Sequence, residues 1–99
     1  MPRFDVFASG AGSALLLDVQ ADILDPLNTR IVVPLMPPDE APKPARRLNP
    51  VFTIGGARVV MVTQFLSAVR ISDLGRQVAT LEAEQDQVKD ALNMLFQGF

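Results

Sequence analysis

Short hydrophobic runs, many of them alternating with polar residues, follow one another along most of the chain, a pattern typical of β-strands. The runs are four to six residues long and rich in Val, Ile, Leu or Phe. They cover residues 4–9, 14–19, 30–35, 51–54, 57–62 and 68–71. Gly55 and Gly56 separate two of these runs and suit the two-residue turn of a β-hairpin. The pattern therefore predicts five or more short strands.

Glycine, proline and polar residues separate the predicted strands. The cluster at residues 9–13 indicates a flexible turn, and the order Asp-Pro-Leu-Asn at residues 25–28 favours a type I turn. Residues 34–50 contain six of the eight prolines, which makes this stretch a loop. A further turn is expected at residues 72–75.

A helical period of about 3.6 residues is found only toward the end of the chain. Thr80 is a suitable N-cap there, and Glu82 and Glu84 follow near the positive end of the helix dipole. The apolar residues that share one face of this helix are Leu81, Val88, Ala91, Leu92, Leu95 and Phe99. The chain is predicted to be one domain over residues 1–99, mainly β with one C-terminal α-helix.

Composition fits a single folded domain and removes several kinds of chemistry. Hydrophobic residues make up 48% of the 99 residues, a share that indicates a globule rather than a disordered chain. The sequence contains no Cys and no His, so disulfides, thiolate or imidazole metal sites and Ser–His–Asp or Cys–His catalysis are excluded. We expect no metal and no cofactor.

Charge and hydropathy limit the partners. The net charge is −2 and no basic cluster exceeds Arg46-Arg47, whereas nucleic-acid binding needs several cations. No stretch approaches the ~20 apolar residues of a membrane span. We expect a cytoplasmic protein that neither binds nucleic acid directly nor associates with a membrane.

Carboxylates are the remaining candidates for catalysis. Asp18, Asp22 and Asp25 lie within eight residues and could form a cation site or an acid–base pair. In the alternative interpretation Asp25 starts a turn and the other two lie in solvent at strand ends. The alternative is favoured, so the chain is predicted not to be an enzyme.

The last helical turn combines Phe96 and Phe99 with the helix-ending Gly98. Neighbouring helical residues point about 100° apart, so Met94, Leu95 and Phe96 cannot all face the core. Terminal aromatics either cap the core or form an anchor patch for another protein, and aromatic residues are enriched in such patches. The strand parity of the first predicted strand likewise exposes one of its two phenylalanines.

Three segments resemble the CcdB toxins, the toxic proteins of plasmid and chromosomal toxin–antitoxin modules. They read Asp-Val-Gln-Ala-Asp-Ile-Leu-Asp at 18–25, Leu-Asn-Thr-Arg-Ile-Val-Val-Pro-Leu at 27–35 and Leu-Asn-Met-Leu-Phe-Gln-Gly-Phe at 92–99. Asn-Pro-Val-Phe-Thr-Ile-Gly at 49–55 also fits the family pattern. The resemblance covers nearly the whole chain, in the same order and at nearly the same length.

This resemblance implies an SH3-like barrel with a small additional sheet and a long C-terminal helix, assembled as a symmetric homodimer. It implies binding to the A subunit of DNA gyrase, with the cleaved-DNA complex trapped. It also implies a cognate antitoxin that neutralises the toxin and represses the operon together with it. Such a toxin acts by binding, in agreement with the absence of a catalytic constellation.

The resemblance further assigns residues to a gyrase-facing surface at the end of the helix and the adjacent strand ends. The positions that match the family there are Phe4, Ile23, Asn93, Phe96 and Gly98.

Three other positions of that surface depart from the best-known members. Phe7 stands in place of a tyrosine, and Phe99 in place of a terminal isoleucine. Gln97 occupies the position of a tryptophan whose dimer-related rings stack on a gyrase arginine. Glutamine has no π face, so that cation–π contact is missing, although its amide can still accept a hydrogen bond.

The antitoxin surface implied by the family involves the first hairpin and the proline-rich loop. It includes Ser9 and Gly10 in the hairpin, and Arg46 and Arg47 in the loop. For the two arginines, an ordinary solvated loop is the alternative to pairing with an acidic antitoxin. The alternative for the whole chain is a non-toxic or weakened module that binds antitoxin and takes part in operon autoregulation.

Overall fold

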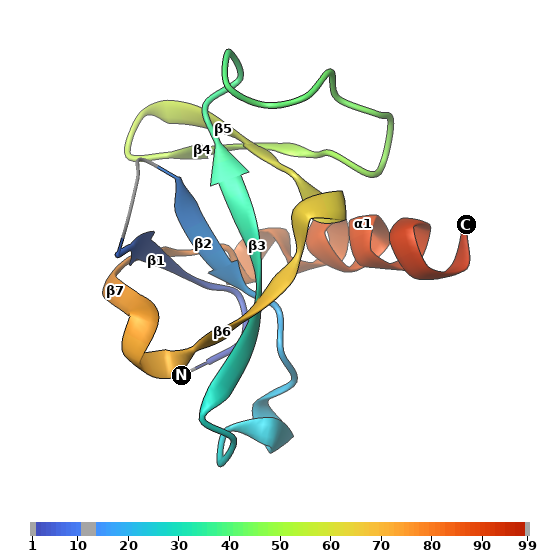
Figure 1. Ribbon diagram of the computed structural model, residues 1–99. Coiled ribbons are helices and arrows are strands. Elements are labelled where there is room, and N and C mark those ends of the chain that lie inside the picture. The colour runs from blue at the N-terminus through green and yellow to red at the C-terminus, as the bar shows by residue number, and fades with distance from the viewer. Residues whose placement is uncertain (1, 11–13, 99) are drawn as a thin grey trace.

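The protein consists of a strongly curled antiparallel sheet with one long helix packed against it (Figure 1). The computed structural model describes residues 2–10 and 14–98. Within these ranges the strands are β1 (Asp5–Ser9), β2 (Leu15–Asp18), β3 (Thr29–Met36), β4 (Val51–Ile54), β5 (Ala57–Met61), β6 (Ser67–Arg70) and β7 (Leu74–Thr80), followed by α1 (Gln85–Gln97). The mainly β fold with one C-terminal helix is confirmed.

Strand β3 determines how the sheet curls. The strand order is β4-β5-β3-β2-β1-β7, and β6 also pairs with β3. The first half of β3, Thr29–Val32, pairs with β6, whereas Leu35 and Met36 pair with β5. One long strand therefore carries two partners end to end, and the sheet bends into an open half-barrel. The small additional sheet implied by the resemblance is not separate: the β4–β5 hairpin continues the main sheet.

Helix α1 covers one face of the sheet and completes the core. Val88, Ala91 and Leu92 of the helix are buried against apolar side chains of the strands. The strand residues of this cluster include Val6, Leu17, Val33, Leu35, Phe52, Val59 and Met61. The predicted apolar stripe is confirmed for Leu81 and these three helical residues; Leu95 is half-buried and Phe99 lies outside the described residues.

The start of the helix differs from the prediction. Thr80 ends β7, and α1 begins only at Gln85, after a 3₁₀ turn at Glu82–Glu84. Thr80 Oγ1 still accepts a hydrogen bond from the Glu82 N–H at 3.2 Å. At the other end, Gly98 has φ +80°, and its N–H donates to the Met94 carbonyl at 3.1 Å. Its left-handed conformation ends the helix as the sequence predicts.

One of the predicted turns is confirmed, and another begins earlier in the chain than predicted. Gly55 and Gly56 both have positive φ, as a two-residue hairpin turn requires, and β4 and β5 pair on either side of them. The turn expected at residues 25–28 begins earlier, because the Leu24 carbonyl accepts from the Leu27 N–H at 3.0 Å.

Strand β7 begins within the turn that was expected at residues 72–75 and continues through residues 76–79, for which no element was predicted. A 3₁₀ turn at Ile71–Asp73 leads directly into the seven residues of β7, which pair with β1. Most side chains of β7 are exposed, so its sequence lacks the alternation that identifies a strand. Gly75 lies against β1 so closely that a Cβ there would be 2.7 Å from the Ala8 carbonyl oxygen.

A buried ion pair joins β2 to β3 on the face of the sheet opposite to the main core. The Arg30 guanidinium is 1% exposed and donates from Nε and Nη2 to one carboxylate oxygen of Asp18, at 2.9 and 2.5 Å. The other oxygen of Asp18 accepts the Gln20 N–H at 3.0 Å. Burial raises the pKa of the Asp18 carboxyl, and the bonds from Arg30 oppose that rise without cancelling it.

A second ion pair fastens the long loop to the helix. Arg47 donates from Nε and Nη2 to the two carboxylate oxygens of Asp90, at 3.0 and 2.7 Å. Arg47 has φ +65°, an uncommon conformation for a residue with a side chain. Asn49 holds the loop from the other side: its amide donates to the Met61 carbonyl at 3.0 Å, and its oxygen accepts the Ala45 N–H. The loop is therefore fixed at its end.

Substitution of Arg30 by methionine is expected to lower the free energy of unfolding by about 3–5 kcal/mol, because it leaves a buried carboxylate without its partner. The loss should be largest at neutral pH. It should shrink as the pH falls through the raised pKa of Asp18 toward 3.8, and it should be smallest below 3.8, where the carboxyl is protonated in both the folded and the unfolded state. Urea unfolding followed by circular dichroism measures the effect. The double variant Asp18→Asn/Arg30→Met should lose less than Arg30→Met; an equal or larger loss would contradict the charge argument.

Substitution of Asp90 by asparagine should loosen the loop in a pH-dependent manner. The Arg47 guanidinium lowers the pKa of Asp90, so the pair stabilises the folded state above pH 3.8 and is lost as the pH falls through the lowered value. At pH 7 amide exchange in residues 45–49 should be faster in the variant than in the wild type. The difference should vanish in acid. Asp86→Asn, on the same helix, is the control and should leave these amides unchanged.

Candidate functional site

The surface near the end of α1 combines exposed apolar side chains with polar ones. Phe96 is 69% exposed although it lies on the last full turn of the helix. Asn93 and Gln97 are exposed beside it, and Gly98 ends the helix. Phe99, the remaining predicted member of this group, lies outside the described residues. An aromatic ring held on a rigid helix with so little cover is typical of a protein-binding anchor.

A groove connects this helix end to the 3₁₀ turn at Asp22–Leu24. Its volume is about 430 Å³. Its walls are mostly apolar and come from five parts of the chain: Arg3, Val19, Gln20, Ala21, Leu24, Ile31, Leu66, Leu92 and Phe96. Ile23, in the same 3₁₀ turn, is 85% exposed. The fold therefore brings two distant parts of the sequence to one groove: Leu24 of this turn and Phe96 of the helix line it, and Ile23 lies next to Leu24 in the turn. We call these three residues the apolar rim.

The turn that carries Ile23 is held by hydrogen bonds from several directions. The side chain of Gln20 donates to the carbonyls of Leu24 and Thr29, and its oxygen accepts the Ile31 N–H at 3.1 Å. Asp22 accepts the Arg3 N–H at 2.7 Å.

Arg30 supplies a further contact to this turn. Its Nη1 donates to Asp25 Oδ1 at 2.5 Å, and this contact lowers the pKa of the Asp25 carboxyl. The same guanidinium that pairs with the buried Asp18 thus reaches the partly exposed Asp25. Ile23 is consequently presented to solvent on a turn whose backbone is fixed, so a partner would not have to order it first.

Two predicted gyrase-facing residues, Phe4 and Phe7, are buried. The expectation that one of them points away from the interior is wrong, because both faces of this curled sheet are covered. Phe4 has φ +74°; its N–H donates to the Asp18 carbonyl and its carbonyl accepts the Leu81 N–H, both at 2.8 Å. The Arg3 guanidinium lies 4.9 Å from the centre of the Phe4 ring. Both aromatic rings therefore offer a partner little surface.

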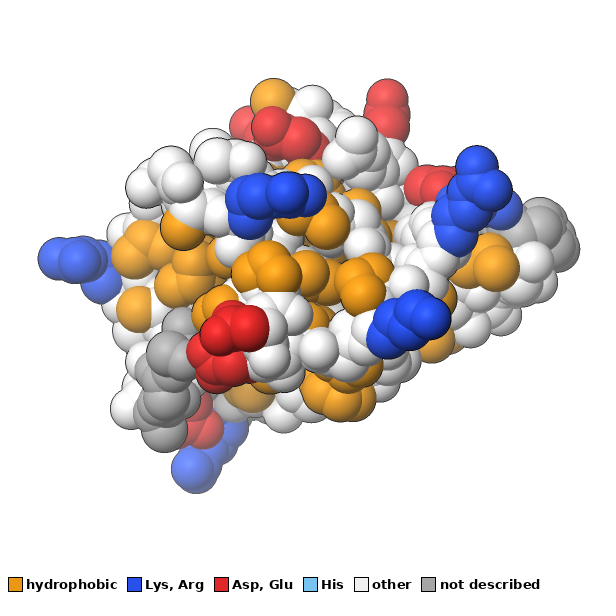
Figure 2. Space-filling view, turned by 90° about the horizontal axis from the view of Figure 1, so that it is seen from above, with side chains coloured by type: hydrophobic (Ala, Val, Ile, Leu, Met, Phe, Trp, Pro, Cys, Tyr) orange, Lys and Arg blue, Asp and Glu red, His pale blue; other side chains and the backbone are white. Residues whose placement is uncertain are grey.

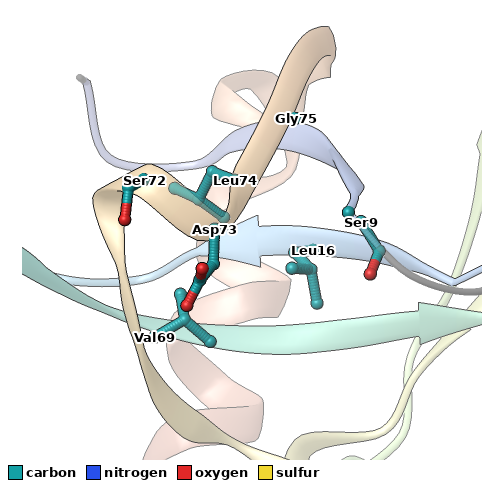
Figure 3. A pocket seen from close by; sticks show the side chains of 8 residues that line it. Ser9, Leu16, Val69, Ser72, Asp73, Leu74 and Gly75 are labelled. Carbon is teal, nitrogen blue, oxygen red and sulfur yellow. The ribbon is translucent and has the colours of Figure 1, made fainter.

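The predicted antitoxin residues lie in two different settings. Ser9 and Gly10 line a cavity of about 460 Å³ between the β1–β2 hairpin and the β6–β7 connection, together with Leu16, Val69, Ser72, Asp73, Leu74 and Gly75 (Figure 3). Arg46 is exposed on the long loop. Arg47 is exposed as well, but its guanidinium already pairs with Asp90. The structure therefore does not bring the four residues into one continuous pocket.

The three candidate carboxylates have structural roles. Asp18 is fully buried in the ion pair with Arg30, so the expectation that it lies in solvent is wrong. Asp22 and Asp25 hold the 3₁₀ turn through Arg3 and Arg30. In the described part of the chain, no group of three or more Asp, Glu, His or Cys side chains is placed to hold a metal ion. None of the helices described is both long and apolar enough to cross a membrane.

The sequence alone predicted neither this groove nor Leu24, the residue of the turn that lines it. A period-two or helical pattern indicates which face of one element is buried, but a groove lined by five segments has no such signature. The hydrophobic pair Ile23-Leu24 between acidic residues was the available signal, since both are exposed in a short turn. Gln20 was likewise not singled out, although its buried side chain closes the turn.

Three solved structures have a similar fold. The Mycobacterium tuberculosis toxin MazF-mt6 has a TM-score of 0.76 at 14% identity, covering 93% of this chain and 95% of that one. A structure of an Mtb toxin has a TM-score of 0.74 at 18% identity, covering 92% and 99%. An endoribonuclease in complex with its cognate antitoxin, from a mycobacterial species, has a TM-score of 0.73 at 15% identity, covering 95% and 93%. At these identities the likeness is one of fold.

The match to a family model is more specific. The model of the CcdB protein matches residues 3–98 and so includes the apolar rim, the buried ion pair and the helix end. The sequence segments that resemble CcdB toxins fall within this range or end one residue beyond it. The chain belongs to the CcdB family.

Proposed function

We propose that this protein is the toxin of a type II toxin–antitoxin module and that it binds the A subunit of DNA gyrase, trapping the cleaved-DNA complex. Membership of the CcdB family supports the toxin assignment. The proposal places the toxin in the cytoplasm, where gyrase acts. It poisons by binding, and the chain performs no chemistry of its own.

The observation that carries this proposal is the apolar rim at the end of α1. Phe96 and Ile23 are among the most exposed large apolar side chains, and each belongs to an element whose backbone is hydrogen-bonded in place. Rigid apolar anchors around a groove are typical of binding hot spots. Asn93 and Gln97 add hydrogen-bonding groups on the exposed side of the same helix. Gly98 and Phe99 complete the proposed gyrase-binding surface.

We also propose a symmetric homodimer. Besides the rim, Phe65 and Leu27 are exposed, and a dimer interface would cover apolar side chains of this kind. A two-fold axis near the end of α1 would place two copies of Gln97 side by side, where the family prototype presents two tryptophans. Small domains gain burial by such self-association.

The cognate antitoxin is the second partner in this proposal. One of the similar folds was solved in complex with its cognate antitoxin, which supports an antitoxin partner for this toxin fold. Ser9 and Gly10 at the cavity, and Arg46 and Arg47 on the loop, are the proposed contacts. Neutralisation and repression of the operon by the toxin–antitoxin complex complete the proposal.

Gln97 favours a second candidate, a weakened CcdB-like module that still binds antitoxin and contributes to autoregulation. Its flexible amide replaces the aromatic platform of the prototype, so only a hydrogen bond to a gyrase arginine remains. The two candidates differ in one measurable property, the stabilisation of gyrase-dependent DNA breaks.

A gyrase cleavage assay tests the proposal. At micromolar concentration the wild-type protein should increase linear plasmid in the presence of gyrase and ATP. Phe96→Ala should raise the concentration needed by roughly 10- to 30-fold, since truncating an aromatic hot spot costs about 2 kcal/mol. Val78→Ala, at an exposed apolar position on β7, is the matched control and should behave as the wild type. No breaks with the wild-type protein would contradict gyrase poisoning, and RNA cleavage by the chain would contradict action by binding alone.

Gln97→Trp should make the protein a stronger poison. Restoring an aromatic face for a gyrase arginine should lower the concentration needed for half-maximal cleavage by about 3- to 10-fold, in line with a cation–π contact of roughly 1 kcal/mol. Gln87→Trp, earlier on the exposed side of the same helix, controls for added apolar surface. Sedimentation of each variant should give the mass of a dimer. An unchanged cleavage curve for Gln97→Trp would show that position 97 does not face gyrase.

A further inference from the structure

Charge is segregated along this chain. Residues 41–72 contain five of the nine cations and none of the eleven acids. These cations are Lys43, Arg46, Arg47, Arg58 and Arg70. The net charge of −2 therefore conceals a strongly positive segment within an otherwise acidic protein. That segment comprises most of the long loop, the β4–β5 hairpin and β6.

Several cations of this segment are available to a partner. Arg47 is paired with Asp90 and Arg70 with Asp73. Lys43, Arg46 and Arg58 are exposed and form no ion pair with any other residue in the ranges the structure describes. The surface seen from the side of the loop and the hairpin shows hydrophobic side chains between separate Lys and Arg side chains, with Asp and Glu side chains also present on this face (Figure 2).

Strand β4 gives this positive region an open backbone edge. It is the terminal strand in the order β4-β5-β3-β2-β1-β7, and its only ladder partner among the described strands is β5. The two-residue turn makes Ile54 and Ala57 a hydrogen-bonded pair, so by alternation Phe52 also bonds across to β5. The N–H and C=O groups of Val51 and Thr53 therefore point away from β5, toward the open edge.

The side chains along this edge define a recognition pattern. Val51 and Thr53 are exposed, and Thr53 lies opposite Arg58 in the ladder, on the same face. Phe52, between them, points into the core. An extended segment pairing with β4 would thus meet an apolar side chain, a polar one and a guanidinium along one face, with further cations on the adjacent loop.

We propose that β4 accepts an extended, acidic segment of the cognate antitoxin, which adds a strand to the sheet and places carboxylates against Arg58 and Arg46. The inference rests on the proposed function, since it takes the antitoxin as the partner. Backbone hydrogen bonds supply affinity in such strand addition, and alternate side chains supply specificity. The contact lies at the β4 edge, outside the Ser9–Gly10 cavity and apart from the apolar rim.

A peptide fits this surface better than a nucleic acid does. Tight binding of duplex DNA commonly involves six to ten phosphate contacts, and only three unpaired cations lie here in a protein of net negative charge. Moreover, the N–H and C=O groups of an exposed strand edge can each form a hydrogen bond with a peptide backbone. Phosphates cannot pair with both kinds of group in this way.

The test measures binding of the purified cognate antitoxin to the full-length toxin by calorimetry. Arg58→Glu should weaken binding by roughly tenfold, because it removes one cation and repels the acidic segment. Arg76→Glu, an identical charge change at an exposed position of β7, should alter affinity by no more than about twofold.

A backbone variant tests strand addition itself. Thr53→Pro removes an N–H that points away from β5, so the β4–β5 ladder stays intact while a partner strand loses its donor. It should weaken antitoxin binding by about tenfold or more, whereas Thr53→Val, which keeps the N–H, should not. Amide exchange at Thr53 in the wild-type protein should slow on binding, a readout that needs no variant to fold.

The outcomes separate this inference from the proposed function. Tight antitoxin binding that is equal in all variants, with no protection of the Thr53 amide, would overturn strand addition and leave the toxin assignment standing. No antitoxin binding at all would overturn the inference, while the gyrase cleavage assay would still decide the toxin assignment. Binding of operator DNA by the toxin alone, lost in Arg58→Glu with antitoxin affinity unchanged, would assign the surface to nucleic acid instead.

Discussion

The ion pair between Arg30 and Asp18 is the interaction on which the arrangement of this protein most depends. Burying two charges in a small domain is costly, and the pair is tolerated because each oxygen of Asp18 and several N–H groups of Arg30 are hydrogen-bonded. The same guanidinium reaches Asp25, so one residue of β3 fixes both the neighbouring strand and the turn carrying Ile23. The stability of the sheet and the placement of the apolar rim are thereby linked through a single side chain.

The fold presents two exposed surfaces of different chemistry. The rim at the end of α1 is apolar and rigid, whereas the β4 edge is cationic and offers free backbone groups. The apolar rim suits a partner with a preformed protein surface, because binding there removes apolar side chains from water. The β4 edge suits a chain that is extended when it binds. In the proposed function this separation is useful, because an extended antitoxin segment would begin to bind at the β4 edge while gyrase still occupies the rim.

The sequence was most informative where one element determines its own surroundings. The Gly55-Gly56 turn, the helix-ending Gly98 and the buried stripe of α1 follow from local rules, and the structure confirms them. Strand β7 was missed because its side chains face solvent, and Thr80 was assigned to the helix because nothing local shows that β1 pairs with it. Phe4 and Phe7 were misjudged for the same reason, since burial on both faces of a strand depends on how the sheet curls. The groove beside Phe96 depends on five segments and has no local signal at all.

The residues proposed to bind gyrase contribute little to the stability of the fold. The potency of the proposed toxin can therefore vary without a change in the fold. Ile23 and Phe96 are mostly in solvent, and Gln97 is exposed on the last turn of α1, so changing them costs little folding free energy. Arg30 and Gln20, which hold the turn that carries Ile23, are buried and cannot change without loss of stability. Substitutions at position 97 can therefore change the strength of the proposed binding to gyrase while the fold stays the same. A glutamine there is compatible with an intact CcdB fold, and the strength of the proposed contact with gyrase depends on the exposed surface alone.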